Sequence, residues 1–322
     1  MTTVEPTGPS PRIAVVGSIN MDLVVRCQRL PRPGETIMGL DAREVSGGKG
    51  ANQAVAAARL GAHVSMVGRV GSDGFGETLR NCLQAEGIHT AHVARTPGCS
   101  SGLAIVAVET SGENAITVVP GANGRLSPED VRAAADVIEA ADVLLLQLEV
   151  PTETVIAASG IARSAGTRVI LDPAPAPTDV PDGLLAVDLL CPNESEAAAL
   201  TGLPVASDDD LRVAADRLHA MSGAGVIITL GECGALYRAG ETGEFVQMPA
   251  YRCTAVDTTA AGDAFAAGLA LRLAEGADVA ESVRFANATA AIAASRHGAQ
   301  PGMPTRAEVE QLIADSSQST TE

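Results

Sequence analysis

Residues 46–61 read SGGKGANQAVAAARLG, a glycine-rich turn that leads into an alanine-rich amphipathic run. The pattern predicts a strand-to-helix turn with Lys49 at the helix N-terminus. Lys49 is the single lysine of the chain, because the other 21 of its 22 basic residues are arginine. The helix dipole disfavours a cation there, whereas the glycines let a ligand approach the backbone closely. Two interpretations stay open: an ordinary turn with an incidental lysine, or a binding site.

The residues around this turn predict a buried strand and a separate small sheet. Residues 12–17 form a short apolar run closed by a glycine, which is typical of a buried strand. Residues 22–46 are partly alternating and rich in turn residues, and residues 102–108 and 115–119 form a hairpin pattern around the turn at 111–114. We expect these short strands to lie apart from the main sheet.

The chain beyond residue 125 alternates between helical and buried-strand patterns. A helix is predicted over residues 128–140, since Ser127 is a good N-cap and Pro128 suits the first helical position. The following short apolar runs predict strands at residues 142–148, 167–171, 184–191 and 225–230. The predicted fold class is therefore α/β: a doubly wound, mostly parallel sheet flanked by helices, with a small antiparallel β lid.

Polar side chains follow the predicted strands at the point where each strand ends. The carboxyl ends of parallel strands meet at one edge of a sheet, and ligands bind there in open α/β folds. The residues concerned are Asn20, Asp22, Glu149, Asp172, Asn193, Glu196 and Thr229. The alternative is that strands end in polar residues because loops are solvated. The number of such positions favours a shared site.

Composition narrows the function classes and the compartment. The net charge is −17 and no basic cluster occurs, which argues against nucleic acid or a membrane surface as the main partner. The six cysteines are scattered without a C-x-x-C pair, so they predict neither a zinc site nor a disulfide framework, and they favour a reducing cytoplasm. No signal-like or membrane-spanning stretch is evident. We expect a soluble, unexported protein.

A second glycine-containing helix start lies at residues 257–268, which read DTTAAGDAFAAG. Small residues at positions 260–262 leave backbone N–H groups pointing outward, which is a ready anion site. Asp263 in the first turn has two interpretations. It is either a carboxylate that favours the helix dipole, or a general base beside a phosphate.

Taken together, the segments 47–52 and 257–268 match the two signature regions of the PfkB family of carbohydrate kinases. The resemblance extends over roughly residues 12–312 and has a ribokinase-like order of motifs. These motifs lie at residues 17–22, 33–36, 47–54, 121–123, 147–149, 172–176, 192–196, 229–231 and 298–301. Two departures are Ala266 in place of an asparagine, and Asp172 where close relatives often have asparagine.

The resemblance implies ATP-dependent phosphorylation of D-ribose to D-ribose 5-phosphate, with ADP as the second product. Asp263 is then the general base, and the amides of Ala261, Gly262 and Asp263 form the anion hole. The implied sugar-binding residues are Asn20, Asp22, Gly48, Lys49, Asn52, Glu149 and Asp263. A polyol needs donors and acceptors at fixed spacing, which suits this set.

The resemblance also implies ATP, Mg2+ and K+ sites. The implied nucleotide-binding residues are Asn193, Thr229, Gly231, Gly234, Gly262 and Asn287. Magnesium is expected near Asn193 and Glu196, since it prefers oxygen ligands and phosphates. The implied monovalent-cation residues are Asp257, Thr259, Ala293, Arg296 and Gly298, mostly through backbone carbonyls. The alternatives are an ordinary exposed helical asparagine for Asn287 and a capping carboxylate for Asp257.

The expected organisation is one main domain with an elaboration. Residues 1–11 are expected to be a disordered tail, residues 12–315 an α/β domain and residues 316–322 a polar tail. The lid strands are drawn from about 22–46 and 101–120. In relatives the lid covers the sugar and pairs with that of a second subunit, so the resemblance implies a homodimer.

The motifs also argue against other function classes. A P-loop kinase is disfavoured because no G-x-x-x-x-G-K-[ST] motif occurs, and a dinucleotide-binding dehydrogenase because Gly17 opens no G-x-G-x-x-G motif. Two alternatives remain open: another kinase of the family, acting on deoxyribose, fructose or a nucleoside, and a catalytically silent sugar-binding regulator. A sugar-binding regulator needs no general base beside a phosphate-binding site, so the presence of Asp263 argues against this alternative.

Overall fold

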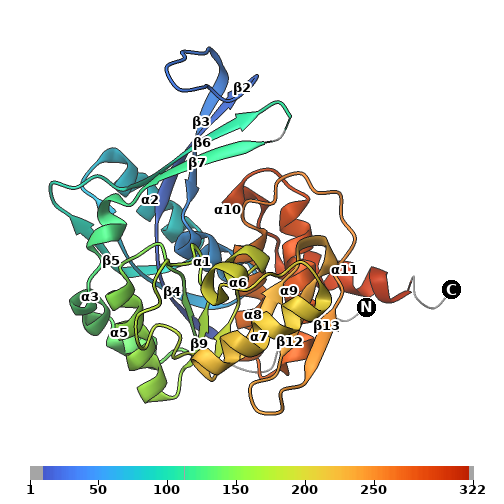
Figure 1. The fold of residues 1–322 in the computed structure, drawn as a ribbon. Helices are drawn as coiled ribbons and strands as arrows, with labels where there is room; N and C mark the ends of the chain where they lie inside the picture. Colours follow the sequence, from blue (N-terminus) through green and yellow to red (C-terminus); the bar gives the residue numbers. More distant parts are fainter. Residues whose placement is uncertain (1–9, 112, 319–322) are drawn as a thin grey trace.

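The computed structural model describes residues 10–111 and 113–318, and these form two sheets with helices around the larger one (Figure 1). The larger sheet has nine strands and the smaller has four. The larger sheet contains, in spatial order, β13 (Phe245–Met248), β12 (Ala235–Arg238), β11 (Gly225–Thr229), β10 (Leu189–Leu190), β9 (Arg168–Leu171), β8 (Val143–Leu146), β1 (Arg12–Val16), β4 (His63–Gly71) and β5 (His89–Thr96).

The large sheet is parallel from β11 to β5, and β12 and β13 extend one edge in antiparallel pairing. Strand β1 lies between β8 and β4, with Ile13 opposite both Val143 and Val64. The carboxyl ends of β1, β8, β9, β10 and β11 therefore meet along one edge. The predicted fold class is confirmed.

Alternate residues of β1 face two separate cores. Ile13 and Val15 belong to one core and Ala14 and Val16 to the other. The first core is covered by α1 (Lys49–Arg59), α2 (Gly74–Ala85), α8 (Ala261–Ala274), α9 (Val279–Ala294) and α11 (Arg306–Gln318). The second is covered by α3 (Pro128–Ala133), α4 (Ala135–Glu139), α5 (Thr152–Ala165), α6 (Glu194–Thr201) and α7 (Asp208–Ser222). Burial on both faces explains why the strands are continuously apolar.

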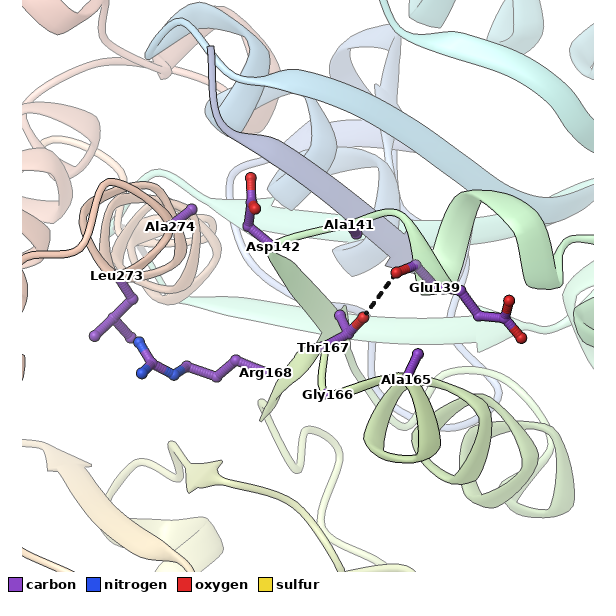
Figure 2. Close-up of a pocket in the computed structure, with 9 residues that line it drawn as sticks. All are labelled: Glu139, Ala141, Asp142, Ala165, Gly166, Thr167, Arg168, Leu273 and Ala274. Atoms are coloured by element: carbon purple, nitrogen blue, oxygen red, sulfur yellow. Dashed lines mark hydrogen bonds between the residues drawn. The ribbon is translucent and has the colours of Figure 1, made fainter. Parts of the chain in front are cut away.

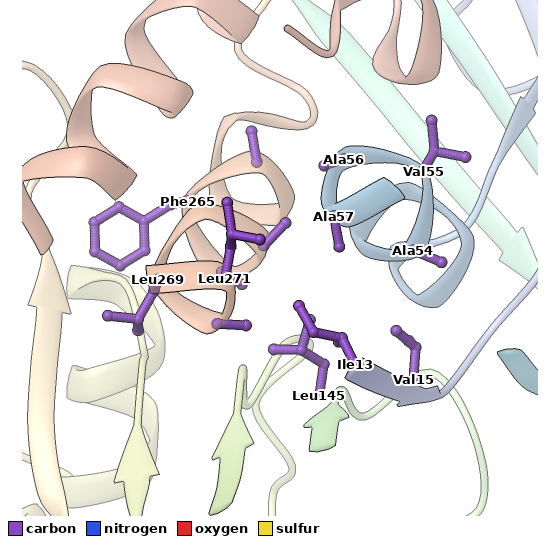
Figure 3. Packing of buried hydrophobic residues seen from close by; sticks show 14 of the residues in the cluster. Ile13, Val15, Ala54, Val55, Ala56, Ala57, Leu145, Phe265, Leu269 and Leu271 are labelled. Carbon is purple, nitrogen blue, oxygen red and sulfur yellow. The ribbon is translucent and has the colours of Figure 1, made fainter. Parts of the chain in front are cut away.

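The first core is packed with small side chains. Figure 3 shows Ala56 and Ala57 on the side of α1 that faces α8, with Leu271 of α8 opposite and Ile13 and Leu145 of the sheet below. Alanine-rich helix faces allow the two helices to approach each other and the sheet closely. This close packing brings the N-terminal ends of α1 and α8 to the same place.

Three sequence predictions need correction. The run at residues 184–191 contains a strand of only two residues, β10, because most of it forms turns. The helix expected over 128–140 is divided into α3 and α4 at Ala134. Ser127 caps α3 as predicted, because its side chain accepts from the Asp130 nitrogen and the Asp130 side chain accepts from the Ser127 nitrogen. Residues 316–318 belong to α11 rather than to a tail. The predicted tails at 1–9 and 319–322 lie outside the described residues.

The smaller sheet has the order β3 (Gly39–Gly47), β2 (Asn20–Cys27), β6 (Gly102–Glu109) and β7 (Asn114–Val119). Its outer pairs are antiparallel, as expected, but its central pair β2–β6 is parallel. Figure 1 shows this sheet projecting away from the body above the carboxyl edge of the large sheet. Because β2 begins soon after β1 ends, it starts at this edge. Within residues 10–111 and 113–318, no helix is both long and apolar enough to cross a bilayer.

Candidate active site at the meeting of two helix N-termini

The glycine turn before α1 packs directly against the end of β1. Gly48 has a φ of +89°, a conformation that favours glycine, and a Cβ there would lie 2.7 Å from the Asn20 nitrogen. A Cβ on Gly50 would lie 2.7 Å from the backbone of Gly17 and Ser18. The glycines are therefore required for this close approach, which fixes where α1 begins and where Lys49 stands.

Asp263, in the first turn of α8, is held by side chains from α1. Asn52 donates from Nδ2 to Asp263 Oδ2 at 2.9 Å, and Gln53 donates from Nε2 to Asp263 Oδ1 at 3.2 Å. Asp263 is only 3% exposed. The Asn52 Oδ1 atom is buried and has no hydrogen-bond partner. An unpaired buried acceptor is costly, so its position here points to a donor supplied by a ligand.

The N-terminus of α8 has no capping side chain. The amide of Ala261 donates to Thr258 O at 3.2 Å, so one of the three predicted anion-hole amides is already engaged. Gly262 is exposed and Asp263 is buried. An uncapped helix N-terminus presents N–H groups and a positive dipole end, which together suit an anion.

A buried polar network continues from Asp263 into the sheet edge. Gln53 Nε2 also donates to Asp172 Oδ2 at 3.0 Å, and Gln53 Oε1 accepts from Gln147 Nε2 at 2.5 Å. Asp172 follows β9 and Gln147 follows β8. The strand-end prediction thus brings Asp172 to the same site as Asp263.

Glu149 and Asn20 lie next to the glycine turn. Glu149 Oε2 accepts from Ser18 Oγ at 2.5 Å and from the Lys49 backbone nitrogen at 3.2 Å. Asn20 Oδ1 accepts from Asn123 Nδ2 at 2.6 Å. These bonds orient groups that are otherwise available to a polyol.

Asp22 packs over the backbone of the glycine turn. A Cβ on Gly47 would lie 2.2 Å from Asp22 Oδ2, so only glycine leaves space for this carboxylate. Asp22 is on β2, at the base of the small sheet. The structure therefore brings the other six residues expected to bind the sugar close to Asp263. They are Asn20, Asp22, Gly48, Lys49, Asn52 and Glu149.

Desolvation dominates the electrostatics of this cluster. Burial, together with the charges of Glu149 and Asp263, raises the pKa of Asp22 to about 7. Burial also raises the pKa of Asp172 to about 7. The charge of Lys49 opposes this rise, and repulsion from Asp263, Glu196 and Glu149 adds to it. The pKa of Asp263 is raised by burial as well, although Lys49, Asn52 and Gln53 oppose that shift.

Lys49 is the cation that faces these carboxylates. Burial lowers the pKa of its ammonium group, but the combined charges of Asp172, Asp263, Glu149 and Glu196 raise it above its ordinary value. Lys49 therefore remains protonated at all physiological pH values. The unfavourable position at a helix N-terminus is offset by these four carboxylates.

The residues expected to contact nucleotide lie along the neighbouring strands. Asn193 and Thr229 form a parallel bridge, and Asn193 and Glu196 form a capping box for α6, with Glu196 Oε2 accepting from the Asn193 nitrogen at 2.9 Å. Gly231 and Gly234 have positive φ values, and a Cβ on Gly234 would lie 2.1 Å from Met248 O. Gly234 thus allows the loop after β13 to approach closely.

Asn287 is buried, so the interpretation as an exposed helical asparagine is wrong. Its Nδ2 donates to Met248 O at 3.3 Å and to Pro249 O at 3.0 Å, and the residue is 5% exposed. The side chain therefore anchors the loop after β13, next to Gly234.

The residues expected at the monovalent-cation site lie on adjoining loops. Asp257 Oδ2 accepts from the Gly298 nitrogen at 3.0 Å, while Oδ1 accepts from Thr259 Oγ1 at 2.6 Å. Ala293 lies nearby in the last turn of α9, next to Ala294, whose carbonyl oxygen accepts from the Asp257 nitrogen at 3.1 Å. The Arg296 side chain instead pairs with Glu308 on α11. Among the described residues, no group of three His, Cys, Asp or Glu side chains is arranged to hold a metal ion.

Several members of the polar network are not among the predicted site residues. They are Ser18, Gln53, Asn123 and Gln147, all of which are at least nine-tenths buried. The available signal was a polar residue within an otherwise apolar run, as with Gln53 among alanines. Their hydrogen bonds join segments far apart in the chain, so periodicity could not pair them.

A separate hollow of about 330 Å3 lies at the opposite, amino edge of the large sheet (Figure 2). It is bordered by Glu139, Asp142, Thr167, Arg168 and Leu273. Its charged side chains are exposed, and Asp142 accepts from the Arg12 nitrogen at 2.8 Å. Because it contains no buried unpaired polar group, it does not compete with the carboxyl edge as a candidate site.

Comparisons with known proteins find relatives along nearly the whole chain. Residues 10–306 match the model of the pfkB family carbohydrate kinases. The Bacillus subtilis ribokinase is 42% identical over 302 residues, covering 94% of this chain and 99% of that relative. The Salmonella typhi deoxyribokinase is 39% identical over 295 residues, covering 91% and 95%. The structure of Arabidopsis thaliana ribokinase complexed with ribose and ATP is 34% identical, with a TM-score of 0.87 over 95% of this chain and 99% of that one.

The electrostatics predict that Asp172→Asn stabilises the ligand-free protein. A carboxylate whose pKa is higher in the folded state makes folding less favourable as pH rises from about 4 to about 7. Asparagine removes this charge and keeps an acceptor for Gln53. At pH 8 we expect the thermal midpoint to rise by at least about 2 °C, and the difference to shrink towards pH 5. Asp179→Asn, at an exposed carboxylate, is the control, and an unchanged or lower midpoint for Asp172→Asn at pH 8 would contradict the prediction.

Proposed function

Because this chain belongs to the pfkB family of carbohydrate kinases, we propose that it transfers the γ-phosphoryl group of ATP to the 5-hydroxyl of D-ribose. The observation that carries the proposal is the buried carboxylate of Asp263 at an uncapped helix N-terminus, bonded to Asn52 and facing Lys49. A silent sugar-binding regulator would need no base at this position.

Asp263 is the proposed general base. It accepts the proton of the sugar hydroxyl while that oxygen forms a bond to the γ-phosphorus, and the bond between that phosphorus and the bridging oxygen breaks to release ADP. Its pKa is raised by burial, so it is a stronger base than an exposed aspartate. Activity should therefore fall as pH is lowered through this raised pKa.

Two features of the site are proposed to stabilise the negative charge of the transferred phosphoryl group. The amides of Gly262 and Asp263 at the start of α8 face the anion, and the helix dipole adds to their effect. The Lys49 ammonium, held by the glycine turn, is available to a sugar oxygen and to the transferred phosphoryl group. The engaged amide of Ala261 contributes only if its bond to Thr258 opens.

The sugar hydroxyls are proposed to bind Asn20, Asp22, Asn52 and Glu149, with Gly48 at the backbone. Support comes from the unpaired Asn52 Oδ1 atom, which needs a donor, and from the fixed orientation of Asn20 and Glu149. A site built to pair a hydroxyl discriminates strongly against an analogue that lacks it. This is the basis for preferring ribose to 2-deoxyribose.

The nucleotide is proposed to lie along Asn193, Thr229, Gly231 and Gly234, with Asn287 supporting the adjacent loop. Asn193 and Glu196 supply the hard oxygen donors that suit Mg2+, which would neutralise phosphate charge when bound. Asp257 and the carbonyls of Thr259, Ala293, Arg296 and Gly298 are proposed to hold K+, supported by the bonds that join these loops. All six cysteines are free, which supports a cytoplasmic location.

A homodimer is proposed through the small sheet. Its side chains Ile105, Ile116, Val118 and Val119 are each between 41% and 49% exposed, and Met38 beside it is 87% exposed. An apolar sheet that projects from the body is an unfavourable surface for a monomer. A second copy of the same sheet would cover it.

A substrate panel tests the proposed function. ADP release is measured with ribose, 2-deoxyribose, fructose, adenosine and pseudouridine, each with and without K+ and Mg2+. We expect ribose to have the highest kcat/KM, and K+ to increase turnover. A higher kcat/KM for another acceptor would contradict the ribose assignment, and absence of ADP release with every acceptor would contradict the kinase assignment.

Sedimentation velocity tests the dimer. We expect a dimer at micromolar concentration, and Ile116→Asp with Val118→Asp is expected to shift it to monomer, because each places a charge on the apolar sheet. Thr242→Asp, in a remote loop, serves as the control. A wild-type monomer would contradict the proposal.

A further inference from the structure

Gln53 is a buried amide on α1, within a stretch from Gly50 to Ala57 that is buried throughout. It is 0% exposed, and its neighbours on α1 include Ala54, Val55, Ala56 and Ala57, which are all buried. A glutamine at such a position is unfavourable unless its amide is fully hydrogen-bonded. Its bonds to Asp263, Asp172 and Gln147 satisfy this requirement.

The orientation of the Gln53 amide follows from chemistry as well as from the coordinates. Two carboxylate oxygens face one end of the amide, and carboxylates accept hydrogen bonds, so the NH2 group must lie at that end. The carbonyl end then needs a donor, which Gln147 Nε2 provides. Gln147 packs against Gly17, where a Cβ would lie 2.0 Å from its Oε1 atom, and this oxygen is buried without a hydrogen-bond partner among the described residues.

We propose that Gln53 is the positioning residue for the base: one amide nitrogen, aimed by Gln147, spans Asp172 and Asp263 and holds the Asp263 carboxylate in place. This inference rests on the proposed function. Gln53 is no catalytic residue, because it acts through Asp263.

Because the Gln53 amide lies between two carboxylates, it also affects how readily each of them is ionised. One N–H stabilises the charged form of Asp263, and the other stabilises that of Asp172, so the two like charges are bridged by a donor. The charged groups around Asp263 are Lys49 on α1, Asp172 after β9, Glu149 after β8 and Asp22 on β2. Without the Gln53 amide, only Lys49 and Asn52 would oppose the rise in the pKa of Asp263 that burial causes.

The test replaces the amide by an apolar side chain of similar length. For Gln53→Met we expect kcat with the preferred sugar at pH 7 to fall by about tenfold or more, with sugar KM within about threefold of wild type. The acidic limb of the kcat–pH profile should move up by about one unit, because Asp263 loses a donor to its charged form. Gln84→Met, at a helical glutamine bonded to Thr90 outside the site, is the control and should match wild type.

A second variant distinguishes positioning from packing. In the Gln53→Met background, Asp172→Asn removes the neighbouring like charge, so the acidic limb should move back towards wild type. Equal losses in kcat and sugar affinity, with an unmoved acidic limb, would show that Gln53 only supports packing and would overturn the inference.

A readout independent of turnover separates this inference from the proposed function. The 13C carboxyl resonance that disappears in Asp263→Asn is titrated in ligand-free wild type and in Gln53→Met. We expect a higher pKa for Asp263 in the variant, and an unchanged pKa would overturn the inference. If this shift occurs but the wild-type protein phosphorylates no sugar, the proposed function alone fails.

Discussion

The candidate site depends on concentrating several carboxylates in a desolvated space with one ammonium group among them. Asp22, Glu149, Asp172 and Asp263 come from four different segments, and burial raises the pKa of three of them. Lys49 is the cation that acts on Asp172 and Asp263 together. The ligand-free protein is therefore under electrostatic stress at this edge, and a bound polyol and phosphate would supply the donors and the charge partner that it lacks.

The fold produces this concentration in two ways. Parallel strands bring their carboxyl ends to one edge, which places Glu149 and Asp172 together. The close packing of α1 and α8, made possible by alanine-rich faces, then brings Lys49, Asn52 and Gln53 against Asp263. The glycine turn completes the arrangement, because a Cβ at Gly48 or Gly50 would collide with the backbone after β1.

The sequence was informative where local chemistry determines the structure. Strand-end polar residues, the glycine turn and the small residues before Asp263 predict the candidate site, and the apolar runs predict the parallel sheet that the structure contains. The short β10, the break at Ala134 and the parallel pairing of β2 with β6 depend on tertiary packing, which periodicity does not report. The Gln147–Gln53–Asp172 network was missed for the same reason, since its hydrogen bonds join α1 to the ends of β8 and β9.

The kinetics of Lys49→Arg test most directly whether a compact ammonium in the glycine turn is required. Arginine keeps the charge, but its planar fork is larger and cannot occupy the same position. We expect kcat/KM with the preferred sugar to fall by at least about tenfold while the variant remains folded. Wild-type kinetics in Lys49→Arg would contradict it, because any cation at this helix start would then suffice.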